Sequence, residues 1–481
     1  MPAYEAVIGL EVHARLKTAS KLFCSCPVSF GAAPNEQVCE VCSGMPGALP
    51  RLNEKAVELA ARAGLALNCT VNTYSLFSRK NYFYPDLPDG FQTSQFVPPV
   101  CEKGYLDISV KGRNRRVGIT RVHLENDAGK CLHVGGATLV DLNRAGTALI
   151  EIVSEPDMRS AEEAAEFMRR IHALLVAIEV TDGNMEEGSL RCDVNVSLRP
   201  AGETTLGTRS ETKNLNSFRH VQRAVDYEIA RQRACLEDGG VVLQETRLFD
   251  AATQETHAMR SKEDAHDYRY FPNPDLPPIR IDPERIEEWR RTMPELPGPR
   301  AARFAADYGL PDEDAELLAA DKDTAGYFEA AASLCGNPRR TASLMRGELL
   351  RECAAAGIKA GEARMTPPLL AELVRLIDGG ALSVRIAHEI FPELFASGSS
   401  PERFAAERNL VQLSDSGALE AVVDGVLSAF PAEVAGYRGG KTKLLAFFVG
   451  KVMAGTGGKA NPAVVNGLLR EKLGAAPGPQ A

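Results

Sequence analysis

The chain has 481 residues, of which 44% are hydrophobic and 25% are charged, and its formal net charge is −9. This length allows about two to four domains with a large core, and the negative balance argues against a protein coated with nucleic acid over its whole surface. No apolar run approaches the roughly 20 residues of a membrane span, and the first residues lack a basic stretch followed by an apolar one. We therefore expect a cytoplasmic protein with no membrane partner.

Four apolar runs carry ionisable or polar side chains at every second position. Because successive side chains of a strand point to opposite faces, this alternation predicts β-strands with one apolar and one polar face. A polar face that simply looks at solvent is the alternative for any one of them. The runs are VIGLEVH (7–13), ITRVHLEND (119–127), ALIEIVSEPD (148–157) and RCDVNVSL (191–198).

The polar faces gather carboxylates, imidazoles and amides, which suit a hard cation such as Mg²⁺. Set near Arg and Lys, such ligands serve phosphoryl transfer, in which the protein positions groups and stabilises charge. A metal-dependent hydrolase would use the same groups, and the residues alone do not separate the two. The side chains on these faces include Glu11, His13, Arg121, His123, Glu125, Glu151, Asp193 and Asn195.

Helical patterns separate the strand-like runs, at Asn53–Leu67, Ala161–Ile178 and Ser217–Leu236. Together they predict an α+β fold with a largely antiparallel sheet and flanking helices. The string PELPGP (294–299) then interrupts the chain, and beyond it Ala, Leu, Glu and Arg dominate in helical patterns.

A second joint is expected at ASGSSPE (396–402). We therefore predict an α+β domain at 1–294, an all-helical domain at 295–400 and a small helical tail domain at 401–475.

Four cysteines form two close pairs, Cys24 with Cys26 and Cys39 with Cys42. Two such pairs in a cytosolic chain suit a closed, structural Zn²⁺ site with four thiolates. Four thiols without metal are the alternative.

Two loops rich in aromatic residues and proline are candidates for binding. In FSRKNYFYPDLPDGFQTSQF (77–96), Arg79 and Lys80 could hold phosphates, and Tyr82, Phe83 and Tyr84 could wall a pocket or stack on a base, with core packing as the alternative. DYRYFPNPDLPP (267–278) offers Asp267, Arg269 and Tyr270, none of which the sequence singles out. In SETKNLNSF (210–218), Glu211 and Lys213 share a strand face.

The tail is basic although the whole chain is acidic. Such a patch favours a local contact with a phosphate backbone, and a solvated helical face is the alternative. The candidate residues for this contact are Arg438, Lys441, Lys443, Lys451 and Lys459.

Long strings of this chain closely resemble, in order, the B subunit family of the glutamyl/aspartyl-tRNA amidotransferases. They include VIGLEVHARLKT, FSRKNYFYPDLPDGFQTSQF, HLENDAGK, DLNRAGTALIEIVSEPD, EEGSLRCDVNVSLRP, ETKNLNSF and DYRYFPNPDLPP, with KTKLLAFFVGKVMAGTGGKANP in the tail.

The resemblance implies an ATP-dependent transamidation of misacylated Glu-tRNA(Gln) or Asp-tRNA(Asn). A cradle-shaped, kinase-like N-terminal domain would phosphorylate the side-chain carboxylate, and the helical domains would grip the tRNA. A partner amidase (A) subunit would supply ammonia, and a small belt (C) subunit would join the two large subunits in a heterotrimer.

The family's Mg²⁺ and catalytic positions fall on Glu11, His13, Glu125 and Glu151, with Asp193 and Glu211 as further ligands. Arg79, Lys80 and Lys213 match basic residues that would bind ATP phosphates. Cys24, Cys26, Cys39 and Cys42 match the zinc-bearing branch of the family. One departure is Asn126, where many relatives carry a second acid.

A different class of function is also open. The chain could be a non-catalytic, zinc-bearing scaffold that binds tRNA, or, as a weaker reading, a free-standing metallohydrolase. Only Mg²⁺-dependent use of ATP separates the scaffold from the enzyme.

Overall fold

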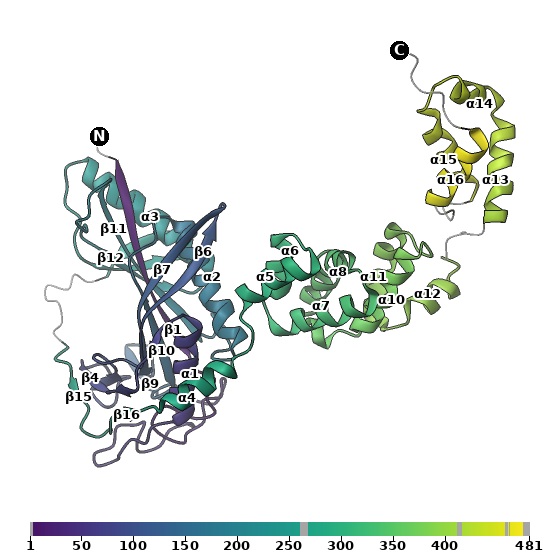
Figure 1. Ribbon diagram of the computed structural model, residues 1–481. Helices are drawn as coiled ribbons and strands as arrows, with labels where there is room; N and C mark the ends of the chain where they lie inside the picture. Colours follow the sequence, from purple (N-terminus) through teal and green to yellow (C-terminus); the bar gives the residue numbers. More distant parts are fainter. Residues whose placement is uncertain (1–2, 260–267, 411–415, 457–459, 461, 475–481) are drawn as a thin grey trace. The chain divides into compact units, whose positions relative to one another are not determined.

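The computed structural model describes residues 3–259, 268–410, 416–456, 460 and 462–474. The chain divides into two compact units, Met1–Leu296 and Pro297–Ala481. The first unit contains the sheets with their helices, and the second is helical (Figure 1). The predicted α+β fold is confirmed.

A nine-stranded sheet forms the centre of the first unit, in the order β14-β13-β12-β11-β1-β10-β7-β6-β2. Neighbouring strands are antiparallel except for β12 and β13, which are parallel. The four runs predicted as strands lie side by side in β11, β1, β10 and β7. The bounds are β1 Tyr4–Arg15, β2 Thr70–Val71, β6 Cys101–Val110, β7 Arg113–Asn126, β10 Ala148–Ser154, β11 Leu190–Pro200, β12 Ser210–Leu215, β13 Thr246–Asp250 and β14 Glu255–Ala258.

One face of this sheet is apolar and covered by helices. In β1 the side chains of Ile8, Leu10 and Val12 are fully buried, and they share one core with Phe167 of α2 and Val221 of α3. Helices α2 and α3 lie against the sheet (Figure 1). The polar side chains that alternate with this core are therefore left on the opposite face.

Three helices of the first unit begin at a side chain that caps their first turn. Asn53, Ser160 and Ser217 each accept a hydrogen bond from a backbone N–H of the first turn, which satisfies a donor that the helix itself leaves unpaired. The helices are α1 Glu54–Ala66, α2 Ala161–Ala177, α3 Phe218–Glu237 and α4 Pro283–Arg291.

Three small sheets complete the first unit. The most important for the site is β15-β4-β5, because β5 contacts β7 of the large sheet. The other two are β16-β3 and the hairpin β8-β9. The bounds are β3 Tyr74–Ser75, β4 Ser78–Asn81, β5 Phe91–Ser94, β8 Lys130–Val134, β9 Ala137–Asp141, β15 Phe271–Pro272 and β16 Ile279–Arg280.

The second unit contains two separate hydrophobic clusters. The first extends from Ala301 to Ala405 in α12, and the second from Leu419 to Leu473. The domain boundaries expected from the sequence stay predictions. No helix in the described ranges combines the length and the apolar character that crossing a membrane requires.

The helices of the second unit are α5 Pro297–Tyr308, α6 Asp312–Ala319, α7 Lys322–Cys335, α8 Pro338–Leu344, α9 Leu350–Ala356, α10 Pro367–Asp378, α11 Val384–Ser397, α12 Pro401–Glu407, α13 Ser416–Ala429, α14 Pro431–Arg438, α15 Leu444–Gly455 and α16 Pro462–Leu473. A π-helical turn over Met345–Leu349 joins α8 to α9, and a short 3₁₀ turn spans Ala360–Glu362.

The core between α2 and the sheet gives the first testable prediction. Phe167→Ala removes a ring that is 0% exposed, so we expect it to lower the free energy of unfolding of the first unit by about 3–5 kcal/mol. Urea denaturation measures this. Phe83→Ala is the control, because its ring is 82% exposed, and an equal loss in both variants would contradict the assigned core.

Candidate functional site

The register of neighbouring strands brings the polar side chains together. His13 of β1 stands opposite Glu151 of β10, which stands opposite His123 of β7. Two residues earlier in β1, Glu11 stands opposite Asp193 of β11. Because opposite Cβ atoms lie about 5 Å apart, side chains of four strands can meet on this one face.

The first group is a histidine–glutamate cluster of His13, Glu125 and Glu151, whose ligand atoms all lie within 4.8 Å of one another. His13 Nε2 is 3.6 Å from Glu151 Oε2 and 3.9 Å from Glu125 Oε2. Both carboxylates are buried. Since two buried carboxylates at this separation repel each other, the cluster requires positive charge.

His123 supplies part of that charge. Its Nε2 lies 3.1 Å from Glu125 Oε1 and 3.2 Å from Glu151 Oε2, so one imidazole bridges the two carboxylates. Burial alone would lower the pKa of His123, but Glu151 and Glu125 outweigh burial and raise it to about 9. Burial would raise the pKa of Glu151, yet His123 and His13 hold it well below its ordinary value.

The β4-β5 sheet fixes Glu125 from the other side. Ser94 Oγ donates to Glu125 Oε1 at 2.8 Å, and Gln92 Nε2 donates to Glu125 Oε2 at 3.1 Å. Hydrogen bonds to both oxygens restrict the rotation of the carboxylate, so it is held in place before any ligand arrives.

The second group is a carboxylate cluster of Glu11, Asp193 and Glu211, again with ligand atoms within 4.8 Å of one another. Lys213 Nζ lies 2.7 Å from Asp193 and 2.8 Å from Glu211 and so offsets two of the three charges. Glu11 accepts a hydrogen bond from Asn195 Nδ2 at 3.0 Å. Burial, followed by repulsion from Glu151, raises the pKa of Glu11.

The six residues predicted as Mg²⁺ ligands thus form two clusters of three. In each, carboxylate oxygens face one another closely enough to be bridged by one cation, which is the ligand chemistry of a hard divalent ion. The histidine–glutamate cluster also offers an imidazole nitrogen. Both donor sets fit a divalent cation, and the repulsion that raises the pKa of Glu11 is relieved when one binds.

Lys80 and Arg79 are neighbours in β4 but point to opposite faces. Lys80 pairs in register with Gln92, which contacts Glu125, and the carboxylates of Glu125 and Glu151 raise its pKa although burial opposes them. Arg79 instead donates to Asp275 at 2.6 Å. The structure therefore places Lys80, and not Arg79, beside the histidine–glutamate cluster.

Asn126, at the position where the resemblance implies an acid in many relatives, does not face this cluster. It follows Glu125 in β7, and its Oδ1 accepts a hydrogen bond from the backbone N–H of Thr93 at 2.7 Å. Its side chain lines a cavity shared with Lys21 and Cys42. In this arrangement Asn126 secures β5 and takes no part in either cluster.

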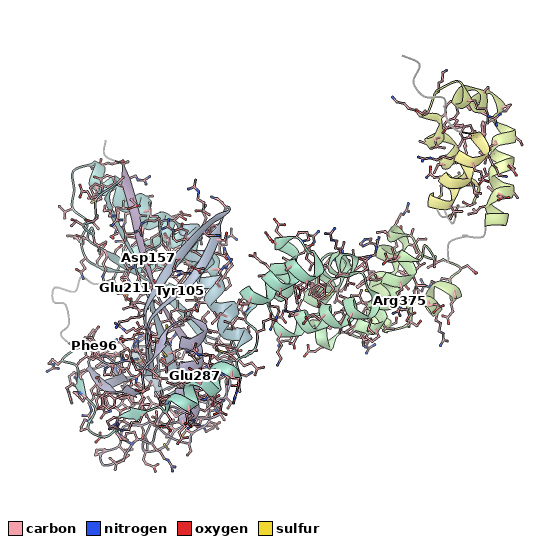
Figure 2. All side chains as sticks on the ribbon, viewed as in Figure 1. Phe96, Tyr105, Asp157, Glu211, Glu287 and Arg375 are labelled. Carbon is pink, nitrogen blue, oxygen red and sulfur yellow. The ribbon has the colours of Figure 1, made fainter. Side chains whose placement is uncertain are left out.

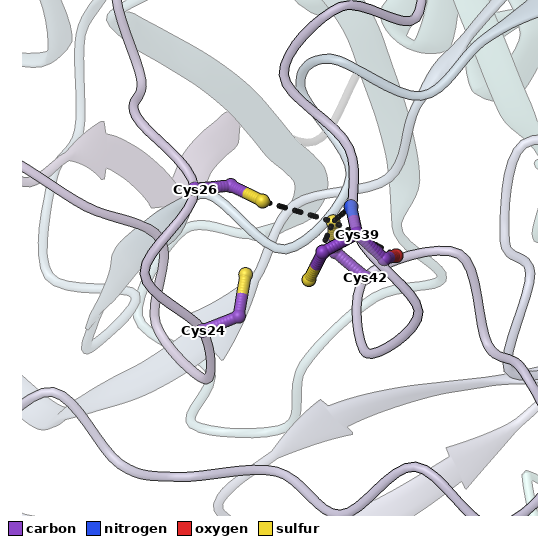
Figure 3. A group of neighbouring side chains, drawn as sticks. All are labelled: Cys24, Cys26, Cys39 and Cys42. Atoms are coloured by element: carbon purple, nitrogen blue, oxygen red, sulfur yellow. Dashed lines mark hydrogen bonds between the residues drawn. The ribbon is translucent and has the colours of Figure 1, made fainter.

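The four predicted cysteines converge, with their Sγ atoms all within 4.8 Å of one another (Figure 3). Cys42 Sγ is 3.9 Å from the Sγ atoms of Cys26 and Cys39. A tetrahedral ion with bonds of about 2.3 Å to sulfur separates its ligands by about 3.8 Å. The cluster could therefore hold a metal ion.

A buried lysine accompanies these thiols. Lys21 is 0% exposed, and its Nζ donates to Cys42 Sγ and to the Leu142 carbonyl, both at 3.2 Å. The hydrogen bond from Cys24, together with Lys21, lowers the pKa of Cys42 to about 4 although burial opposes them. These neighbours favour the thiolate of Cys42, which is the form that binds a metal.

The predicted basic residues of the tail have different surroundings. Lys441 and Lys443 are exposed between α14 and α15. Arg438 donates to the Leu473 and Lys472 carbonyls at the end of α16, and Lys451 lies 5.2 Å from the Phe430 ring centroid. Lys459 lies outside the described residues.

Comparison with known proteins identifies the family. The model described as the GatB/GatE catalytic domain matches residues 6–287, and the one described as the GatB domain matches residues 326–473. The chain belongs to the B subunit family of the tRNA-dependent amidotransferases. The resemblance seen in the sequence is confirmed, and the chain is a subunit of an enzyme of this class.

Relatives over almost the full length agree with this assignment. The chain is 59% identical to a protein of Oleidesulfovibrio alaskensis over 98% of its own length and 100% of the relative. It is 60% identical to one of Nitratidesulfovibrio vulgaris, again over 98% and 100%, and 52% identical to one of Geobacter sulfurreducens over 98% and 99%. Each is named as the B subunit of an aspartyl/glutamyl-tRNA(Asn/Gln) amidotransferase.

The sequence places His123 on the polar face of ITRVHLEND but assigns it no individual role, and it does not single out Gln92 or Ser94, although all three contact the Glu125 carboxylate. No signal in the sequence pairs β5 with Glu125, because that contact depends on how a separate small sheet packs. Asp267 lies outside the described residues.

The bridging imidazole gives a prediction for the metal-free protein. We expect His123 to titrate with a pKa of about 9 and Glu151→Gln to lower that pKa, because one of the two carboxylates loses its charge. NMR of ¹³C-histidine-labelled protein measures both, with His123→Gln to assign the resonance. The pKa of His123 lies above that of a histidine in the unfolded chain. The stabilisation of the fold by the ion pairs of His123 is therefore complete below about pH 6.5 and is lost as the pH rises through about 9. An unshifted resonance would contradict the bridge.

Proposed function

We propose that this chain phosphorylates the side-chain carboxylate of Glu or Asp esterified to tRNA(Gln) or tRNA(Asn), with ATP as donor. It would act in the cytoplasm in a heterotrimer, in which an amidase subunit supplies ammonia from glutamine and a small subunit joins the two. The supporting observation is the pair of clusters on one sheet face, with Lys80 and Lys213 beside them.

The reaction has two steps. An oxygen of the substrate carboxylate attacks the γ-phosphorus of ATP, the bond from phosphorus to the bridging oxygen breaks, and ADP leaves. Ammonia then attacks the activated acyl carbon, the carbon–oxygen bond breaks, and phosphate leaves with a proton released from nitrogen. The amide of Gln-tRNA(Gln) or Asn-tRNA(Asn) remains.

The residues of the chain supply position and charge for the first step. Lys80 and Lys213 would neutralise phosphate oxygens, and His123 holds Glu125 and Glu151 in a fixed geometry. Mg²⁺, when held by the histidine–glutamate cluster and by the carboxylate cluster, would add charge stabilisation at the transferring phosphoryl group. We assign Arg79 to holding β4 against Asp275.

The second unit would bind the body of the tRNA. Lys441 and Lys443 are the exposed cations suited to phosphate contacts, whereas Arg438 also secures the end of α16. The relatives named above carry tRNA in their names, and the GatB domain model covers this region.

Removing one carboxylate tests the catalytic proposal. In the reconstituted complex with ATP, glutamine and Glu-tRNA(Gln), Glu125→Gln is expected to lower amidation at least about 100-fold, because the cation loses a charged ligand. Glutaminase activity of the partner should persist, and Glu237→Gln, an exposed acid of α3, serves as the control. Amidation at the wild-type rate in Glu125→Gln, or tRNA binding without any use of ATP by the wild type, would favour the scaffold function instead.

We further propose that the cysteine cluster holds one structural Zn²⁺. Cys39→Ser combined with Cys42→Ser should remove about one zinc per chain, measured by mass spectrometry of the metals, and should lower the melting temperature, because the loop through Cys24 and Cys42 loses its cross-link. Cys131→Ser should leave both unchanged. If protein purified without zinc had the same melting temperature as the zinc-containing wild type, the assignment of a structural Zn²⁺ would be disproved.

A further inference from the structure

Four aromatic side chains form a ledge beside the histidine–glutamate cluster. We propose that this aromatic ledge, made of Tyr82, Phe96, Tyr268 and Tyr270, binds the terminal base of the acylated tRNA by stacking. The inference rests on the proposed function and adds to it a place for the 3′ nucleoside that carries the amino acid.

The outer end of the ledge is a stacked pair. The rings of Phe96 and Tyr270 are 4.8 Å apart at an interplanar angle of 11°. Phe96 remains 51% exposed and Tyr270 37% exposed, and Phe96 lies at the outer edge of the first unit (Figure 2). Because Phe96 stays half exposed after stacking, it retains apolar surface on which another flat ring can lie.

The inner end of the ledge reaches the charged groups of the site. Tyr268 lies 6.2 Å from Tyr270 and 6.1 Å from Tyr82, and Lys80 Nζ is 5.0 Å from the centroid of the Tyr268 ring. Lys80 pairs in register with Gln92, whose side chain donates to Glu125. One row of rings therefore leads from solvent to Lys80 and to the strand residues that hold Glu125.

The position of the ledge favours the tRNA end over the adenine of ATP. Phe96 follows β5, which packs against β7, whereas Lys213 and the carboxylate cluster lie on β1, β11 and β12, on the other side of β10. A triphosphate would have Lys213 on that side and Lys80 at the inner end of the ledge, whereas the stacked pair of Phe96 and Tyr270 forms the exposed outer end. The aminoacyl group is attached to the terminal ribose, so its base must lie close to the carboxylate that reacts, and an exposed ledge admits a macromolecular end. Proteins commonly bind single-stranded RNA ends by stacking bases on aromatic side chains.

The test uses the intact heterotrimer and Glu-tRNA(Gln) in which 2-aminopurine replaces the terminal adenine. Binding to wild type should quench the fluorescence, and Phe96→Ala combined with Tyr270→Ala should abolish the quenching and raise the KM for tRNA about tenfold. The KM for ATP should stay within about twofold. Phe96→Trp, which keeps a ring, should retain quenching, and Phe30→Ala, which removes a 68% exposed ring of the cysteine loop, should change nothing.

Two results would overturn the inference. A rise in the KM for ATP without one for tRNA would assign the ledge to the adenine of ATP, and unchanged values for both would leave the ledge without a role in binding. If the double variant does not fold, Phe96→Ala alone decides in the same assay. Failure of the proposed function is a separate outcome, because the wild-type complex would then not amidate Glu-tRNA(Gln) at all.

Discussion

The structure depends on one electrostatic constraint. Five acidic side chains lie on one face of a sheet, and the repulsion between their negative charges must be offset by nearby positive groups. Antiparallel register stacks Glu125, Glu151, Glu11, Asp193 and Glu211 across adjacent strands, where partial burial would otherwise drive some of them to bind protons. Imidazole and ammonium groups on the same strands or on the neighbouring small sheet offset this cost, and a divalent cation in each cluster would complete the balance. The same arrangement, which is costly without cations, would suit the ATP proposed as phosphoryl donor, because its triphosphate would bring further negative charge that only cations can hold.

The small β15-β4-β5 sheet gives this face its second wall. One side of it supplies Gln92, Ser94 and Lys80 to the carboxylates, and the other side is held by Arg79 with Asp275 and Phe91. The aromatic ledge continues from the first side toward solvent. Because a strand points successive side chains to opposite faces, the neighbours Arg79 and Lys80 have different roles. The fixed position of β5 explains why protein groups alone hold the Glu125 carboxylate in place.

Much of this architecture could be predicted from the sequence. Alternation identified four strands and the face on which Glu11, His13, Glu125 and Glu151 lie, helical patterns located three helices, and the spacing of cysteines located their cluster. The order of the strands in the sheet could not be predicted from the sequence. The division of the six predicted Mg²⁺ ligands into two clusters could therefore not be predicted either. The bridging role of His123 and the contact of Arg79 with Asp275 could not be predicted for the same reason, since both depend on which strands become neighbours.

The path of oxygen tests the central claim most directly. Glu-tRNA(Gln) carrying ¹⁸O in both side-chain carboxylate oxygens is incubated with the complex, ATP and glutamine, and the released phosphate is analysed by mass spectrometry. If this face transfers the γ-phosphoryl group to the carboxylate, each amide formed releases phosphate with one ¹⁸O atom. Formation of Gln-tRNA(Gln) with phosphate that contains no ¹⁸O would contradict the account.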